Sequence, residues 1–156
     1  MISSNDFKCQ TSEAIWRDYC HLNVDREQLL SMSSLGLAHL GDGVFEVMVR
    51  SWIALHGKAK PKDLHRATVT YVSAPAQAAA MERLLPQLSE EEADVYRRGR
   101  NTAPHSVPKA ASRAQYQAAT GLEALFGWLY LQGRTQRLNE LFEIVMKEEE
   151  EEKECR

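Results

Sequence analysis

The sequence of 156 residues predicts an all-α fold, a helical bundle formed by a single domain. Apolar residues recur three or four positions apart through most of the chain, which is the spacing of a helix that buries one face. No stretch alternates apolar and polar residues with β-branched enrichment, so no strand is predicted. Cap residues, glycines and prolines divide the chain into six or seven helices.

The first half of the chain contains three predicted helices. The first covers about residues 26–56, and Gly57 ends it. A short helix starts after Pro61, because proline suits the first turn of a helix. The third starts at Ser73–Pro75 and runs through an alanine-rich segment to Pro86.

The second half contains three more helices. Ser89–Glu92 has the S-x-x-E form of a capping box and starts a helix that ends near Arg98. Residues 99–108, GRNTAPHSVP, are predicted to form a loop. A largely apolar helix covers residues 112–131, and a last helix starts at Thr135.

Composition favours a soluble, cytoplasmic protein. Apolar residues make up 44% and charged residues 26% of the chain, and no apolar run approaches the roughly 18 residues of a membrane span. The N-terminus lacks the pattern of a signal peptide. The three cysteines are scattered, which indicates neither a disulfide framework nor a zinc site.

Charge separates the chain into parts. We expect an N-terminal extension at residues 1–24, the folded domain at 25–146, and an acidic, disordered tail at 147–156. The tail holds six Glu against three Lys or Arg. Between residues 58 and 113 there are ten Lys or Arg against six Asp or Glu, which is consistent with a polyanionic partner, or with an ordinary solvated surface.

Two acidic residues interrupt the most hydrophobic part of the first helix. Asp42 and Glu46 are four residues apart and would share one helix face, where like charges repel. Glu123 lies in a second apolar helix, and small residues in both helices would allow a close crossing that brings Asp42 near Glu123. Buried carboxylates need a counter-charge, and Mg²⁺ or Mn²⁺ would supply it. The alternative is that each acid pairs with a helix-end amide or a distant arginine.

A cluster of donors follows the capping-box helix. Three arginines and an asparagine suit phosphate oxygens, and two later residues extend the set: Arg97, Arg98, Arg100, Asn101, His105 and Lys109. No aromatic residue interleaves with them, so contact with the phosphates of a duplex is favoured over stacking on single strands. A solvated helix end is the alternative interpretation.

Several motifs resemble the ribonuclease III family. The stretch Leu40–Glu46, LGDGVFE, is similar to its signature, and Thr120–Leu125, TGLEAL, is similar to its second motif. Between them, Lys62–His65, Val72–Ala74 and Arg97–Asn101 look specifically like Mini-ribonuclease III, the short bacterial members.

The resemblance implies a ribonuclease III-like helical homodimer that cleaves double-stranded RNA with Mg²⁺, or with Mn²⁺. It assigns Asp42 and Glu123 as catalytic metal ligands. Glu46, one turn along from Asp42, is a further candidate that orients a water at the metal; the alternative is that it positions the helix or lies at the dimer contact. It also implies maturation of large-subunit (23S) ribosomal RNA precursors, with a ribosomal protein as a candidate partner. Two positions depart from the ribonuclease III pattern: Ala38 and Thr120 stand where that pattern has acids. A non-catalytic RNA-binding module with a decayed site is therefore the alternative, and a helical interaction protein is a third.

Overall fold

The computed structural model describes residues 17–57, 59–102 and 109–154, with side chains as far as Lys147. This part of the chain contains helices and no strand, which confirms the all-α prediction. The elements are α2 (Arg26–Ser31), α3 (Ser34–His56), η1 (Pro61–Asp63), α4 (Leu64–Val72), α5 (Ala74–Leu84), η2 (Leu85–Gln87), α6 (Glu90–Asn101), α7 (Arg113–Leu131) and α8 (Thr135–Glu154).

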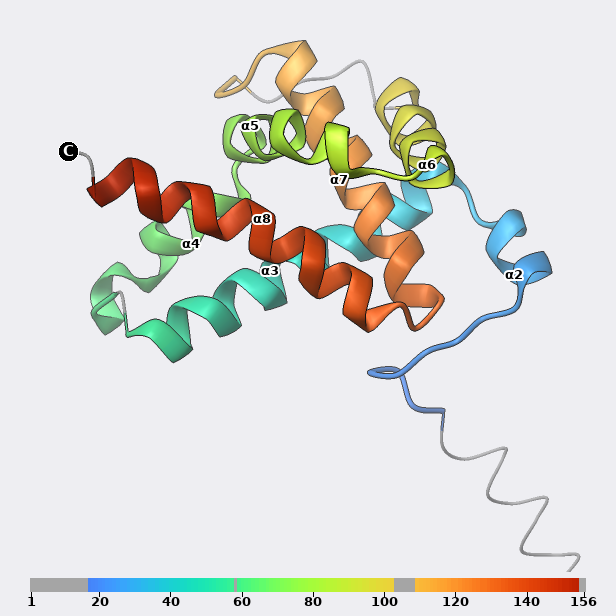
Figure 1. Ribbon diagram of the computed structural model, residues 1–156, viewed down its shortest axis with the longest axis horizontal. Coiled ribbons are helices and arrows are strands. Elements are labelled where there is room, and N and C mark those ends of the chain that lie inside the picture. Colours follow the sequence, from blue (N-terminus) through green and yellow to red (C-terminus); the bar gives the residue numbers. More distant parts are fainter. Residues whose placement is uncertain (1–16, 58, 103–108, 155–156) are drawn as a thin grey trace, which may run out of the picture.

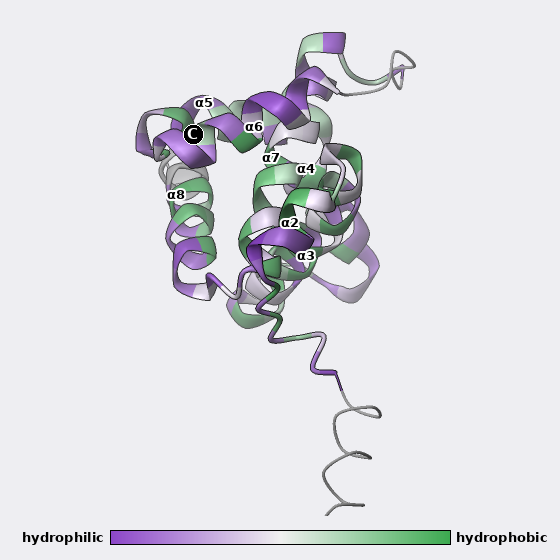
Figure 2. Ribbon diagram, turned by 90° about the vertical axis from the view of Figure 1, so that its right-hand side faces the viewer, coloured by the Kyte–Doolittle hydropathy of each residue, from purple (hydrophilic) through white to green (hydrophobic). Residues whose placement is uncertain are grey.

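Helix α7 lies at the centre of the bundle. Helices α3, α5, α6 and α8 all pack against it (Figure 1). Most of its residues from Ala119 onward are buried, as the largely apolar sequence of this part of the helix requires. Figure 2 shows the hydrophobic faces of the surrounding helices turned inward and their hydrophilic faces turned outward. The amphipathic pattern of the chain therefore surrounds one central apolar helix.

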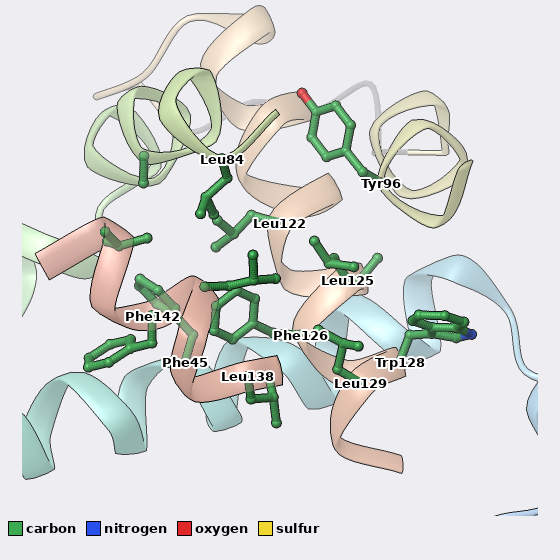
Figure 3. Packing of buried hydrophobic residues seen from close by; sticks show 14 of the residues in the cluster. Phe45, Leu84, Tyr96, Leu122, Leu125, Phe126, Trp128, Leu129, Leu138 and Phe142 are labelled. Carbon is green, nitrogen blue, oxygen red and sulfur yellow. The ribbon is translucent and has the colours of Figure 1, made fainter. Parts of the chain in front are cut away.

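Three phenylalanines join the central helix to its neighbours (Figure 3). The ring of Phe45 on α3 meets Phe126 on α7 edge to face, with centroids 5.3 Å apart, and Phe142 on α8 at 6.0 Å. Edge-to-face pairs of this kind add about 0.5–1.5 kcal/mol beyond the area that they bury. Because Phe45 follows Asp42 by less than one turn, this packing also fixes the part of α3 that carries the acid.

Helices α3 and α7 cross in backbone contact. A Cβ added at Gly41 would lie 1.6 Å from the carbonyl oxygen of Glu123, and one at Gly127 would lie 2.1 Å from that of Leu37. Only glycine fits at either position, so the predicted close crossing is confirmed at this pair of glycines. Gly43, one residue beyond Asp42, faces open space and plays no part in the contact.

A buried ion pair links α6 to α8. Glu92 is 1% exposed, accepts from the backbone N–H of Ser89, and so completes the predicted capping box. Its carboxylate also accepts from the Arg137 guanidinium, at 2.8 Å and 2.9 Å, which lowers the pKa of Glu92. The sequence predicted the cap but not its arginine partner 45 residues away.

Two helix boundaries differ from the prediction. The expected helix over 26–56 is broken, because Met32 is extended and Ser33 caps α3 by accepting from the N–H of Gly36. Residues 99–101 belong to α6 rather than to the predicted loop, since Gly99 packs directly on α7, where a Cβ would lie 3.1 Å from the Cα of Gly121. At the other end of the chain, α8 continues through the acidic segment to Glu154.

The crossing predicts opposite effects of alanine at two nearby glycines. Gly41→Ala should cost about 3 kcal/mol or more in the free energy of unfolding, because its methyl group cannot enter without separating α3 from α7. Gly43→Ala, the matched control, should stabilise the protein by about 0.5–1 kcal/mol, because it removes a helix glycine at an open position. Urea unfolding measures both, and equal effects would contradict the proposed contact.

Candidate metal and RNA site

The structure brings Asp42 and Glu123 together at the crossing of α3 and α7. Gly41, the residue before Asp42, contacts the carbonyl of Glu123 itself. The two carboxyls are close enough for the charge of Asp42 to raise the pKa of Glu123. The sequence-based expectation that these acids meet is therefore confirmed by the arrangement of the two helices.

Glu123 is the more deeply placed acid. Burial, and after it the charge of Asp42, raises the pKa of Glu123 from 4.5 to about 8. The Gln77 side chain on α5 acts in the opposite direction, since its amide favours the charged carboxylate. Without a cation, Glu123 therefore holds a proton at neutral pH.

Asp42 is exposed but stands against the same crossing. Partial burial raises the pKa of Asp42, the charge of Glu46 raises it further, and His39 lowers it. Glu46 is thus close to Asp42, but its carboxylate accepts from Arg50 on the same helix, with 2.8 Å between Nε and Oε1. A direct metal contact by Glu46 would require this ion pair to open.

The donor set fits a hard divalent cation. No Lys or Arg side chain influences the pKa of Asp42 or Glu123, and no described residue forms an ion pair with either. Within the described residues, no group of three or more His, Cys, Asp or Glu could hold a metal. Two carboxylates are nevertheless a common protein contribution to Mg²⁺, which keeps several waters and takes further oxygens from substrate phosphates. A cation at Asp42 and Glu123 would supply the missing counter-charge.

The two departures from the ribonuclease III pattern lie in the core. Ala38 and Thr120 are each 5% exposed. The Thr120 hydroxyl donates to the carbonyl of Tyr116, on its own helix, at 2.9 Å. Neither side chain offers an anionic ligand, so the site has two acids rather than four.

Sequence reasoning missed Gln77. This residue lies in the alanine-rich α5 and is 1% exposed. Neither atom of its amide makes a hydrogen bond of normal geometry, although the amide stands against the Glu123 carboxyl. A long polar side chain among alanines was the only signal in the sequence.

The arginine cluster lies at the C-terminal end of α6, and its members are exposed. Arg97 and Arg98 pair with Asp94 on the same helix, at 3.1 Å and 3.2 Å. Burial raises the pKa of the Tyr96 hydroxyl, the guanidinium of Arg100 lowers it, and the Tyr96 ring packs against Gly121 of α7. Asn101 and Lys109 are also exposed, while His105 lies outside the described residues.

This end of α6 is fixed to the helix that carries Glu123. Gly99 packs against Gly121 and Ala124, with the carbonyl of Thr120 at 3.3 Å from a Cβ added at Gly99. The arginines therefore stand at a set distance from the carboxylates, because two packed helices join the two groups.

Among the described residues, no helix is long and apolar enough to cross a membrane.

Comparisons with known proteins agree with this geometry. The Ribonuclease III domain family matches residues 35–134, which include both acids and the arginine cluster. The Mini-ribonuclease 3 of Symbiobacterium thermophilum is 47% identical over 116 residues, covering 74% of this chain and 89% of that protein. That of Enterococcus faecalis is 40% identical over 133 residues, covering 84% and 93%. The chain belongs to the Mini-ribonuclease 3 family.

A solved structure has the same all-α fold as this chain. The crystal structure of a Fusobacterium nucleatum protein superposes with a TM-score of 0.70 at 28% identity, covering 76% of this chain and 95% of that one. Membership makes the chain an endoribonuclease, so the resemblance stated from its motifs is confirmed. The residue roles remain predictions.

The buried acid predicts how stability depends on pH when chelator removes divalent ions. The pKa of Glu123 is about 8 in the folded chain and near 4.5 unfolded, so the folded state binds more protons between these values. Its stabilising contribution is complete below pH 4.5 and is lost as pH rises through 8. In EDTA, the melting temperature of wild type should therefore fall relative to that of Glu123→Gln between pH 5 and pH 8.5. Circular dichroism melts measure this difference, and a constant gap would contradict the raised pKa.

Proposed function

We propose that this endoribonuclease cleaves double-stranded RNA with Mg²⁺ or Mn²⁺ held by Asp42 and Glu123. The observation that carries the proposal is the pair of acids at the α3–α7 crossing, where no Lys or Arg side chain lowers the pKa of either acid. A bound ion would polarise the scissile phosphate and lower the pKa of the attacking water. Enzymes with the ribonuclease III domain generally depend on divalent metals, which supports the same assignment.

The residues of this chain would divide the work as follows. Asp42 and Glu123 hold the ion, and Glu46 is a candidate to orient a water beside it once Arg50 moves. Arg97, Arg98, Arg100 and Asn101 grip phosphates of the duplex, with His105 and Lys109 assisting. Arg97 and Arg98 form exposed ion pairs with Asp94, weak surface contacts that a phosphate can replace.

A homodimer belongs to the same proposal. Two sites related by a two-fold axis would cut both strands of one duplex. Exposed apolar side chains on α3 support a protein interface, since Val47 is 63% and Leu55 is 85% exposed. The natural substrate that we propose is the large-subunit ribosomal RNA precursor, with a ribosomal protein as a candidate accessory partner in the cytoplasm.

The first prediction tests the reaction and its metal. Wild type should cleave a duplex formed by the paired ends of a 23S precursor in Mg²⁺ and not in EDTA. Asp42→Asn should lose about a hundredfold or more in rate, because it removes a charged ligand. Its melting temperature should stay near that of wild type, since Asp42 is exposed. Tight RNA binding without cleavage by wild type would favour the decayed-site alternative.

The second prediction tests the phosphate grip. Arg97→Ala and Arg100→Ala should each weaken binding to any duplex sequence and reduce the salt dependence of the binding constant by about one counterion. Lys147→Ala is the control, because Lys147 is also exposed and paired with an acid of its own helix, Glu143 at 3.1 Å, but lies on α8. Unchanged salt slopes in both arginine variants would contradict the grip.

The third prediction concerns assembly. Light scattering should give a molar mass twice that of the chain, and the double variant Val47→Glu/Leu55→Glu should reduce it to one chain, because it places charges in the apolar face. A monomeric wild type would refute the dimer.

A further inference from the structure

Gln77 has an unusual environment for a buried polar side chain. It is 1% exposed, and neither its amide nitrogen nor its amide oxygen has a hydrogen-bond partner of normal geometry. A buried amide without partners costs about 1–3 kcal/mol, and nearly all buried polar groups in native structures are paired. An apolar side chain of similar length would be more stable here, so the glutamine calls for a role other than packing.

The position of Gln77 points to that role. Helix α5 packs on α7, and the Gln77 amide lies close enough to the Glu123 carboxyl to lower the pKa of that acid. An ionised carboxylate can only accept hydrogen bonds, so the amide NH₂ is the group that suits it.

We propose that Gln77 is a positioning residue of the metal site, whose amide nitrogen donates to the Glu123 carboxylate and orients it toward a divalent ion shared with Asp42. This inference rests on the proposed function. Residues that orient metal ligands by hydrogen bonding commonly contribute tenfold or more to metal affinity. With two acids in place of four, each carboxylate has more need of such support.

The test combines metal affinity with stability. Gln77→Met, nearly equal in length and volume, should weaken Mn²⁺ binding about tenfold, measured from the loss of the free Mn²⁺ signal in electron paramagnetic resonance. In EDTA its melting temperature should equal or exceed that of wild type, because an unpaired buried amide has been removed. Cleavage should need more Mg²⁺ for half-maximal rate while KM for the duplex stays unchanged.

Two controls keep the outcomes separate. Thr68→Val also replaces a buried polar group, but the Thr68 hydroxyl donates to the Leu64 carbonyl of its own helix α4, so Mn²⁺ affinity should not change. Gln77→Leu repeats the measurement if Gln77→Met does not fold. Wild-type Mn²⁺ affinity in a folded Gln77 variant would overturn the inference alone. If wild type bound no more Mn²⁺ than Asp42→Asn, the proposed function would fail and this inference with it.

Discussion

The contact between the backbones of α3 and α7 is the constraint on which the site depends. Two glycines, Gly41 and Gly127, allow each helix to reach the carbonyls of the other. Gly41 touches the carbonyl of Glu123, and Asp42 follows Gly41 directly. Asp42 and Glu123 are therefore neighbours across the crossing. The contact between the rings of Phe45 on α3 and Phe126 on α7 stabilises the same pair of helices. The acids therefore meet because the core packs, at the expense of their own repulsion.

That repulsion gives the site its chemical character. Burial raises the pKa of both acids, and a neighbouring carboxylate raises each further: Glu46 acts on Asp42, and Asp42 acts on Glu123. Elsewhere in the same chain, the buried Glu92 receives Arg137 and a capped backbone N–H, and its pKa falls. Burial disfavours the charged form of Glu92 and of Glu123 alike, and only a counter-charge can offset that cost. The contrast indicates that a partner is missing at Asp42 and Glu123, whereas the acid of α6 already has its own.

The sequence was sufficient to predict features within a single helix, and the crossing of two helices that both carry small residues. Apolar spacing predicted the helices, and small residues around Asp42 and Glu123 predicted that their helices cross. The break at Met32–Ser33 was missed because the apolar spacing continues through it, while a single serine cap decides the boundary. Gln77 and Arg137 were missed because each acts on an acid far away in the sequence. Glu123 is 46 residues from Gln77 and Glu92 is 45 residues from Arg137, and local spacing does not predict such contacts. The phosphate-binding roles proposed for the arginines rest on resemblance and exposure, and the fold adds their position.

The position of the arginines has a consequence for catalysis. The end of α6 carries Arg97 to Asn101 and is fixed to α7 by Gly99, which packs on the turn of α7 that precedes and includes Glu123. At its start, the same helix is fixed to α8 through Glu92 and Arg137. A helix held at both ends keeps its arginines at a constant distance from the acids, so a duplex bound by its phosphates would present a scissile bond in a defined place. Rigid placement of this kind lowers the entropic cost of reaching the transition state. The α3–α7 crossing thus fixes the acids, and the α6–α7 crossing fixes the arginines proposed to contact phosphates, both through the same central helix.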